Sequence, residues 1–553
     1  MTVPPTHQRP LAPVAPDRPA NGAAPTAFAA LMRGNAERIR EKRQSLRAGL
    51  RSDHFRFLLV LGVIAYVATF VVYNYFFTHV GFTNHTFPHT WVLGYPSFKT
   101  EYEGRWFADI LIQLTGGSGV PTFLIALAAA VQIVNAFVFA AIWRVRNRAT
   151  LVVLVLLFCF HPAILDYYSF SVDHVSFVIG DLLAILGTLA LDRLRNRWYR
   201  IPLAILAFAL ALATYQPKIA LIALLLIAWC LRPGDDNEVE AAAPAMVRRV
   251  AVAVASLSAS VVVYYLSVLL TAARSGGERR HINSVSRMIE TFADSYRETI
   301  ANFTTRVDYL PSLLSFLPAL LFVAAVAVLL VRARRRGLAP VILSVLLIAC
   351  VPPALQLSYI INDETWASVG RILSVHLYLV GFAVIVVMAA NTLGRIAVGV
   401  GSTVLLYFFV TVASQEANSA ALREVYDTAK VQRIVTRIEQ VVPDGLASPR
   451  PVVVIGELPL QSEQPFKRLP NLLYGAHVNS EPFVAYRQTL ILNFFLGRPV
   501  IVAPTEAQIA SATKAAGTHR AWPASDAVFV TDDGVLTVLL QPYRDGVPVT
   551  WKR

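Results

Sequence analysis

Long apolar runs alternate with short basic segments from about residue 57 to residue 414. A helix needs about 20 apolar residues to cross a bilayer, and the pattern predicts eleven spans. They are residues 57–77, 120–143, 151–165, 176–191, 201–215, 218–231, 250–272, 311–331, 338–357, 372–390 and 396–414. Alternate connections are rich in arginine, which is typical of cytoplasmic loops. This bias predicts a cytoplasmic N-terminus, and an odd number of spans then predicts a C-terminus outside the cytoplasm.

The segments that flank the spans have different patterns. Residues 1–54 are rich in proline and then in arginine, which predicts a disordered and basic cytoplasmic segment. Residues 55–414 form the predicted membrane domain, and residues 415–553 a small soluble α/β domain outside the cytoplasm. In this last part, RPVVVIGELP (450–459) and RPVIVAPT (498–505) predict strands, TEAQIASATKAAG a helix, and DAVFVTDDGVLTVLLQ a hairpin. The predicted fold class is therefore an all-α polytopic membrane protein with a C-terminal α/β domain.

Composition narrows the class further. Only 15% of the 553 residues are charged and the mean hydropathy is +0.54, values that exclude an ordinary soluble protein. The net charge of +14 does not indicate nucleic acid binding, because the arginines lie between the apolar runs. Cys159, Cys230 and Cys350 each lie in an apolar run, so we predict neither a disulfide framework nor a metal site made by cysteines.

Two of the predicted spans are short. Residues 151–165 and 201–214 hold about 15 residues each, which is about 22 Å of helix against about 30 Å of hydrocarbon. The polar stretches DYYSFSVDH (166–174) and YQPK (215–218) follow them. Polar groups at membrane depth are tolerated where they line a cavity or are buried in protein. We therefore expect a cavity that opens to the outer face.

The first outer loop contains TEYEGRWFADI (100–110). From Gly104 onward its periodicity predicts a short interfacial helix, with Arg105 and Asp109 on a polar face directed toward the cavity. Glu103 and Asp109 are candidate general bases, Arg105 a candidate phosphate ligand, and Glu101 and Trp106 candidate sugar contacts. The alternative is an ion pair between Arg105 and Asp109 at the surface, which stabilises little. Residues 273–310 predict a second amphipathic helix along the membrane.

The polar stretch DYYSFSVDH offers further candidates. Asp166 and Asp173 are seven residues apart and would share a helix face, as general bases, hydroxyl ligands or ligands of a divalent cation. Tyr167, Tyr168 and His174 are candidate substrate contacts. In the alternative interpretation, Asp173 only caps the next span. No clear metal motif accompanies these carboxylates, so the cofactor stays unknown.

Two cation-bearing stretches complete the candidate site. In YQPK, Pro217 suits a first helical position, so that Gln216 caps the helix and Lys218 supports a phosphate site at its N-terminus. Tyr215 is a candidate stacking residue and Gln216 a candidate substrate contact, and the alternative for Lys218 is snorkelling to the interface. INDETWASVGRILSVH (361–376) adds Arg371 as a second phosphate ligand and two candidate substrate ligands, Asp363 and Glu364.

These stretches also carry a resemblance. The segments NHTFPHTW…LGYPSFKTEYEGRWFADIL, HPAILDYYSFSVDHVSFVIGD and LATYQPKIAL resemble the GtrII-type glucosyltransferase family of bacterial polytopic membrane proteins. Residues 55–230 carry the similarity best, and GRW and YQ are its most specific marks. The resemblance implies the GT-C-like class, with a many-helix fold and a catalytic carboxylate in the first outer loop. It also implies a glucosyl donor on undecaprenyl phosphate and a surface-glycan acceptor such as O-antigen.

The sequence departs from the family at one point. Members often carry a paired Asp early in the first outer loop, whereas THVGFTNHTF (78–87) contains no acid. The candidate base is therefore one of four carboxylates that follow, Glu103, Asp109, Asp166 or Asp173. The combined interpretation is a glycosyltransferase of the bacterial inner membrane, which uses a polyprenyl phosphate sugar and a lipopolysaccharide-type acceptor. A transporter or a polymerase of lipid-linked sugars is the alternative.

Overall fold

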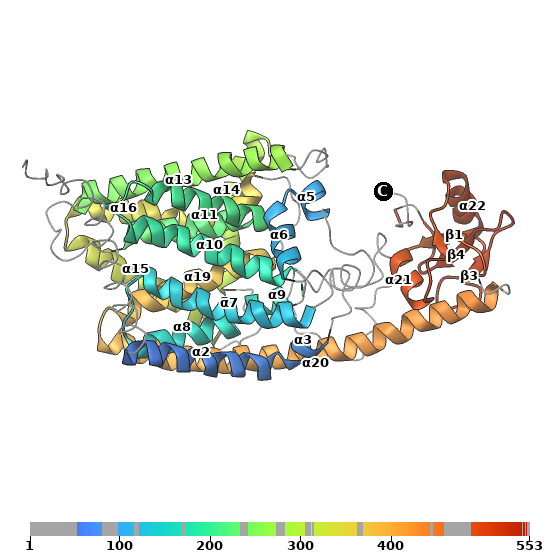
Figure 1. The fold of residues 1–553 in the computed structure, drawn as a ribbon, viewed down its shortest axis with the longest axis horizontal. Helices are drawn as coiled ribbons and strands as arrows, with labels where there is room; N and C mark the ends of the chain where they lie inside the picture. Colours follow the sequence, from blue (N-terminus) through green and yellow to red (C-terminus); the bar gives the residue numbers. More distant parts are fainter. Residues whose placement is uncertain are drawn as a thin grey trace, which may run out of the picture. The chain divides into compact units, whose positions relative to one another are not determined.

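The computed structural model describes residues 52–79, 98–115, 121–168, 170, 173–232, 242–271, 283–304, 311, 314–361, 369–442, 446–457, 488–544, 546–547 and 549. Contacts divide the chain into two compact units, residues 1–63 and 64–553. Within the first unit, residues 53–63 begin a helix with mostly exposed side chains. The second unit contains all the other described elements (Figure 1).

The described part of the chain up to residue 442 is helical. Its helices are α2 (Asp53–Val72), α3 (Asn74–Thr78), α5 (Phe98–Glu103), α6 (Trp106–Leu114), α7 (Pro121–Ile142), α8 (Arg148–Phe160), α9 (Pro162–Tyr168), α10 (His174–Arg193), α11 (Arg200–Thr214), α12 (Lys218–Leu231), α13 (Ala242–Thr271), α14 (Val285–Thr304), α15 (Leu317–Arg334), α16 (Leu338–Ala349), α17 (Val351–Leu355), α18 (Leu357–Ile361), α19 (Val369–Met388) and α20 (Thr392–Val441).

Eight described helices are long and apolar enough to cross a membrane, and three more are apolar but shorter. The eight are Asp53–Val72, Thr122–Ile142, Arg148–Leu165, His174–Arg193, Ala243–Thr271, Leu317–Arg334, Leu338–Leu355 and Thr392–Asn418; the shorter ones are Arg200–Thr214, Lys218–Leu231 and Val375–Met388. All eleven predicted runs fall on these helices, so the protein is an all-helical membrane protein in this part. That each of the eleven crosses the membrane stays a prediction.

Two boundaries differ from the expectation. Arg248 and Arg249 lie inside α13 rather than in a loop before it, because the helix begins at Ala242 and simply extends its polar end. The predicted domain boundary at residue 415 falls inside α20, a continuous helix of 50 residues. From Ser402 to Val441 this helix has neither glycine nor proline, so nothing in the sequence interrupts it.

Helix α10 is the centre of the membrane part. It packs against α7, α11 and α12, and most of its side chains are buried (Figure 1). Close approach is possible because its glycines face their neighbours: a Cβ added at Gly187 would overlap the ring of Phe208, and one at Gly180 would overlap the Thr214 hydroxyl. The ends of α10, α11 and α12 that carry the candidate residues are thereby fixed relative to one another.

The C-terminal part contains a four-stranded sheet in the order β2-β1-β4-β3. Its elements are β1 (Arg450–Ile455), α21 (Gln488–Phe495), β2 (Ile501–Val502), α22 (Glu506–Ala516), β3 (Val528–Val530) and β4 (Leu536–Leu539). Strand β1 is parallel to β2 and β4, whereas β3 and β4 form the predicted antiparallel hairpin. The predicted strands, the helix and the hairpin are confirmed here, with β2 shorter than expected.

Side chains of β1 alternate between two apolar cores, as the period of a strand requires. Val452 and Val454 pack with α21 and with the end of α20, including Val431 and Ile438. On the other face, Val453 packs with α22. The sheet is therefore covered on both faces, and the end of α20 is one of its covering helices.

The packing of α10 on α11 gives a stability prediction. We expect Gly187→Leu to lower the free energy of unfolding by about 1–3 kcal/mol, because the new side chain must displace Phe208. Gly399→Leu in α20 is the matched control, since no atom lies within 4 Å of a Cβ at that position. Thermal unfolding in detergent measures both. An equal melting temperature for the two variants would contradict the close packing described here.

Candidate active site

The GRW segment forms a sharp corner between α5 and α6. Gly104 has a φ of +67°, and a Cβ there would lie 3.3 Å from the Tyr264 hydroxyl of α13, so both the backbone and the space favour glycine. The amides of Gly104 and Arg105 cap α5 on the carbonyls of Thr100 and Lys99, at 3.3 and 2.8 Å. These hydrogen bonds fix the backbone of the corner, and the backbone in turn fixes the positions of its side chains.

Trp106 fastens the corner to α13. Its indole Nε1 donates to Ser267 Oγ at 2.9 Å. This contact uses the polar atom of the ring, so the role we predicted for Trp106, stacking on a sugar, has no support from the contact and stays a prediction. The helix expected after Gly104 is confirmed as α6.

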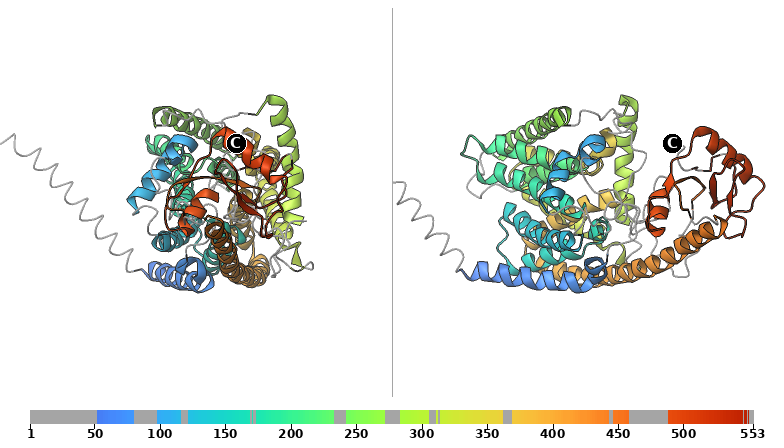
Figure 2. Two further views of the ribbon diagram at one scale, coloured as in Figure 1. Left: turned by 90° about the vertical axis from the view of Figure 1, so that its right-hand side faces the viewer. Right: turned by 45° about the vertical axis from the view of Figure 1, so that its right-hand side comes forward.

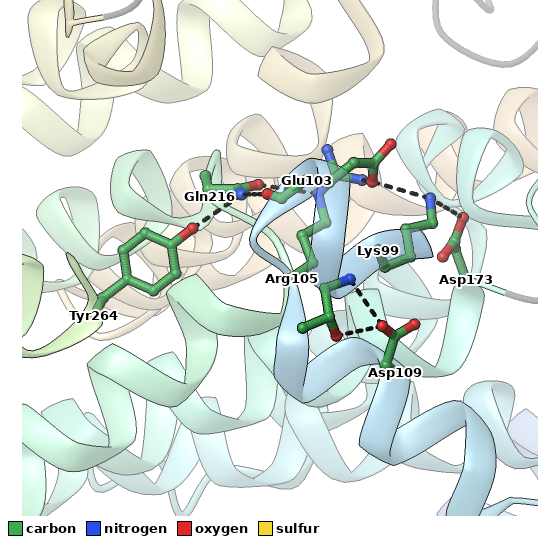
Figure 3. Close-up of polar contacts among 8 residues, drawn as sticks. Lys99, Glu103, Arg105, Asp109, Asp173, Gln216 and Tyr264 are labelled. Carbon is green, nitrogen blue, oxygen red and sulfur yellow. Dashed lines mark hydrogen bonds and ion pairs between the residues drawn. The ribbon is translucent and has the colours of Figure 1, made fainter. Parts of the chain in front are cut away.

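Four charged side chains form an alternating chain at this corner (Figure 3). Lys99 Nζ lies 3.1 Å from Asp173 Oδ2 and 3.2 Å from Glu103 Oε2. Arg105 Nη1 lies 2.8 Å from the same Glu103 oxygen. All four side chains are at most 14% exposed, so water screens them little. The two cations and two carboxylates compensate one another, and they join α5 to the start of α10.

Gln216 connects this chain to the turn between α11 and α12. Its Oε1 accepts a hydrogen bond from Arg105 Nε at 3.0 Å, and its Nε2 donates to the Glu103 carbonyl and, at 2.9 Å, to the Tyr264 hydroxyl (Figure 3). The Arg105 guanidinium also lies 4.6 Å above the Tyr215 ring. The YQ pair therefore orients Arg105. Gln216 is not the helix cap we expected, because α12 begins one residue later and Pro217 takes the cap position.

Asp109 is buried rather than directed into a cavity. One of its oxygens accepts hydrogen bonds from the Thr100 amide, at 2.8 Å, and from the Thr100 hydroxyl. The alternative interpretation, an ion pair between Arg105 and Asp109, does not hold, because Arg105 pairs with Glu103 instead. The predicted polar face was wrong because Asp109 closes the corner by joining α6 to α5. Burial raises the pKa of its carboxyl, against the opposing effect of the Thr100 hydrogen bonds.

A second charged pair lies deeper, between α10 and α12. Lys218 Nζ lies 2.5 Å from Asp181 Oδ1 and donates to the Tyr167 hydroxyl at 2.7 Å. Lys218 and Asp181 are 3% and 1% exposed, so Lys218 does not snorkel to the interface. Its charge is already compensated by Asp181. A direct contact between Lys218 and a phosphate stays a prediction. The Lys218–Asp181 pair does not favour it, because a phosphate would have to compete with Asp181.

The stretch DYYSFSVDH is divided between two helices. Asp166 lies in α9, where only its backbone is described, and Asp173 precedes α10, so the two do not share one helix face as expected. Asp173 occupies the cap position of α10 but makes no capping hydrogen bond, because its carboxylate turns to Lys99. Tyr168 is buried at 3% exposure, which opposes a sugar-stacking role.

His174 is fully buried beside these aromatic rings. Its ring centroid lies 5.9 Å from that of Tyr167 and 4.6 Å from that of Tyr168. Neither ring nitrogen has a hydrogen-bond partner within the part of the chain that the structure describes. The structure describes the other candidates only in part. Glu101 lies on α5 with partial exposure, and Arg371 is described only as backbone in α19. Asp363 and Glu364 lie outside the described residues.

Three residues of the site were missed by sequence reasoning. Asp181 carried a usable signal, since a carboxylate inside an apolar run is expensive and points to a partner or a function. Lys99 directly precedes the acidic stretch, but nothing in the spacing links it to Asp173. Tyr264 lies in a long apolar run with no polar neighbour in sequence. Within the described residues, no group of three or more His, Cys, Asp or Glu is arranged to hold a metal ion.

The geometry defines a polytopic membrane protein with a compensated charge network where α5 and α6 meet α10 and the turn before α12. The profile of the family described as Glucosyl transferase GtrII matches residues 91–388, more than half of the chain, and the chain belongs to this family. The match contains the GRW corner, both charged groups and the turn with Gln216. No curated protein and no solved structure shows significant similarity. Membership of a glucosyltransferase family makes the protein a glycosyltransferase.

The pair of Lys218 and Asp181 can be tested as a unit. We expect Lys218→Met or Asp181→Leu alone to destabilise the protein by about 3–5 kcal/mol, because each leaves a buried charge without a partner. The double variant should recover most of this loss. Thermal unfolding in detergent measures the cycle. A double variant as unstable as the sum of both single changes would show that the two charges are not coupled.

Asp109 gives a pH dependence. Its folded-state pKa is raised, so the stability that its proton contributes is fully present below the unfolded-state pKa of about 4 and is lost as the pH rises through the folded-state pKa. The melting temperature of wild type relative to Asp109→Asn should therefore fall with rising pH. Asp526 is the control of opposite sign, because hydrogen bonds from Arg520 lower the pKa of its carboxyl. The melting temperature of wild type relative to Asp526→Asn should therefore fall as the pH decreases. The same slope for both would contradict this assignment.

Proposed function

We propose that this protein transfers a glucosyl unit from a polyprenyl phosphate donor to a surface glycan, such as O-antigen, at the outer face of the bacterial cytoplasmic membrane. Family membership supports the glucosyl group and the transfer reaction. The apolar helices support the membrane location and a lipid-linked donor. The observation that carries the proposal is the alternating chain of Asp173, Lys99, Glu103 and Arg105, because it places cations beside carboxylates in one fixed cluster.

The proposed topology follows from the charges of the connections. The eight long apolar helices and the three shorter ones give eleven spans. Basic residues lie in the sequence at 144–148, 192–200, 248–249 and 332–336, and Arg395 follows a further short turn. With these segments in the cytoplasm, the GRW corner lies at the outer face. The C-terminal α/β domain then lies outside the cytoplasm, where it can bind the acceptor or cover the site.

The proposed reaction uses the chain as follows. An acceptor hydroxyl attacks the anomeric carbon of the glucosyl group, the bond from that carbon to the phosphate oxygen breaks, and polyprenyl phosphate leaves. Glu103 or Asp173 accepts the hydroxyl proton. Arg105 and Lys99 bind the phosphate as it gains negative charge, since cations aimed at developing charge stabilise a transition state. An incoming phosphate would compete with the carboxylates for these cations, which frees a carboxylate to act as base.

Other candidates receive supporting roles in this proposal. Asp109 positions α5 on α6 rather than accepting a proton, because Thr100 occupies one of its oxygens and the side chain is buried. The pair of Lys218 and Asp181 positions the turn at Tyr215 and Gln216, which in turn orients Arg105. Asp166 and Arg371 keep their proposed roles as a base and a phosphate ligand.

The direct test is transfer by purified protein in detergent from radiolabelled polyprenyl phosphate glucose to a surface-glycan fraction. Loss of the base should reduce the rate by about 100- to 10,000-fold, so we expect this for Glu103→Gln or Asp173→Asn with folding retained. Glu290→Gln is the control, because this exposed carboxylate pairs only with Arg287 among the described contacts of its side chain and should keep full activity. If no polyprenyl phosphate sugar is used but such lipids cross liposome membranes, the protein is a transporter.

A further inference from the structure

Helix α14 has three chemically distinct faces. At about 100° per residue, four apolar side chains lie within an arc of about 80°. They are Val285, Ile289, Phe292 and Ile300, which are 72%, 65%, 46% and 63% exposed. The charged side chains Arg287, Glu290, Asp294 and Arg297 lie on a second arc, roughly opposite, and form the exposed pairs Arg287–Glu290 and Arg297–Asp294. The third face carries Ser295 and Thr299, which are buried against the protein.

This arrangement is unusual for a helix in water. A helix on a soluble protein buries its apolar stripe, whereas α14 buries a small polar face and leaves the apolar stripe exposed. The stripe is nevertheless separate from the charged face. A medium with an apolar and an aqueous side would match both exposed faces at once, which is the environment of a membrane interface.

Polar contacts fix α14 to broken membrane helices. The Asn283 side chain donates to the carbonyls of Tyr359 and Ile360 at 2.9 and 3.1 Å, and the Tyr296 hydroxyl donates to the Ala349 carbonyl at 2.9 Å. Ala349 ends α16, where Pro352 and Pro353 prevent a regular continuation. Helix α14 thus satisfies the Ala349 carbonyl at this break, and Asn283, just before α14, satisfies two carbonyls of α18.

The orientation of α14 agrees with an interfacial position. Figure 2 shows it, in yellow-green, crosswise to the membrane helices in both views. It contacts α15, α17 and α18. The neighbouring α15 and α16 expose apolar side chains such as Leu320 and Leu346, at 55% and 58%, and these belong to the surface that faces lipid in a membrane.

We propose that the apolar stripe of α14 docks into the lipid surface of the membrane, at the boundary between headgroups and acyl chains, with the charged face toward water. The partner is the lipid itself, and the proposal does not depend on the enzymatic reaction. The stripe anchors the helix that covers the break between α16 and α17, so this break is sealed on the side where α14 lies.

Site-directed spin labelling tests the proposal in the full chain. The background is Cys350→Ser, since the other two cysteines are buried. Single labels at Ile289→Cys and Phe292→Cys report on the stripe, and labels at Glu290→Cys and Arg297→Cys are matched controls on the charged face. The protein is placed in vesicles of phosphatidylethanolamine and phosphatidylglycerol. Collision with oxygen, which concentrates in lipid, is compared with collision with a water-soluble nickel chelate.

We expect the ratio of oxygen to nickel collisions to be several-fold higher at the stripe than at the charged face. Equal nickel access on both faces would overturn the proposal, because the stripe would then lie in water. A stripe shielded from both reagents would also overturn it, since a second copy or another protein would then cover the helix. Val285→Cys and Ile300→Cys repeat the measurement at the two ends of the stripe.

Discussion

Charge compensation inside an apolar surrounding is the constraint on which this structure depends. A lone charge at membrane depth is costly, so every buried cation needs a carboxylate and a fixed geometry. Lys218 meets this requirement with Asp181, and Lys99 meets it with Asp173 and Glu103. The Lys218–Asp181 and Lys99–Asp173 pairs join different helices, whereas Lys99–Glu103 lies within α5. The pairs therefore decide which ends of α5, α10 and α12 lie together, and the positions of the uncharged site residues follow from them.

The same constraint gives the corner its chemistry. Arg105 is held on three sides, by Glu103, by the amide of Gln216 and by the face of Tyr215. A guanidinium held in this way is pre-organised for a planar or tetrahedral anion, because little side-chain entropy is left to lose. The two cations and two carboxylates also leave this network without net charge.

Much of the fold was predictable because its signals are local. Apolar length placed the helices, and Asp-Gly between two apolar runs placed the β3–β4 hairpin. The helix after Gly104 and the amphipathic α14 were likewise predicted from sequence. The candidate site was predictable only as a set of segments. Which partner each charge takes depends on distances between helices, so the sequence did not show that Arg105 pairs with Glu103, and Lys99 was overlooked. Asp109 looked exposed because its periodicity matched Arg105, whereas packing of α5 on α6 decided its environment.

The long helix α20 has a consequence for how the chain can be divided. Val431, Ile434 and Ile438 of this helix belong to the same apolar core as Val452 and Val454 of β1. If these residues of α20 are removed, the sheet loses one of the layers that cover it. A fragment that begins at β1 would expose an apolar sheet face and associate with itself. The C-terminal sheet and the end of α20 therefore form one packing unit, and the sheet cannot be separated from this helix without losing part of its core.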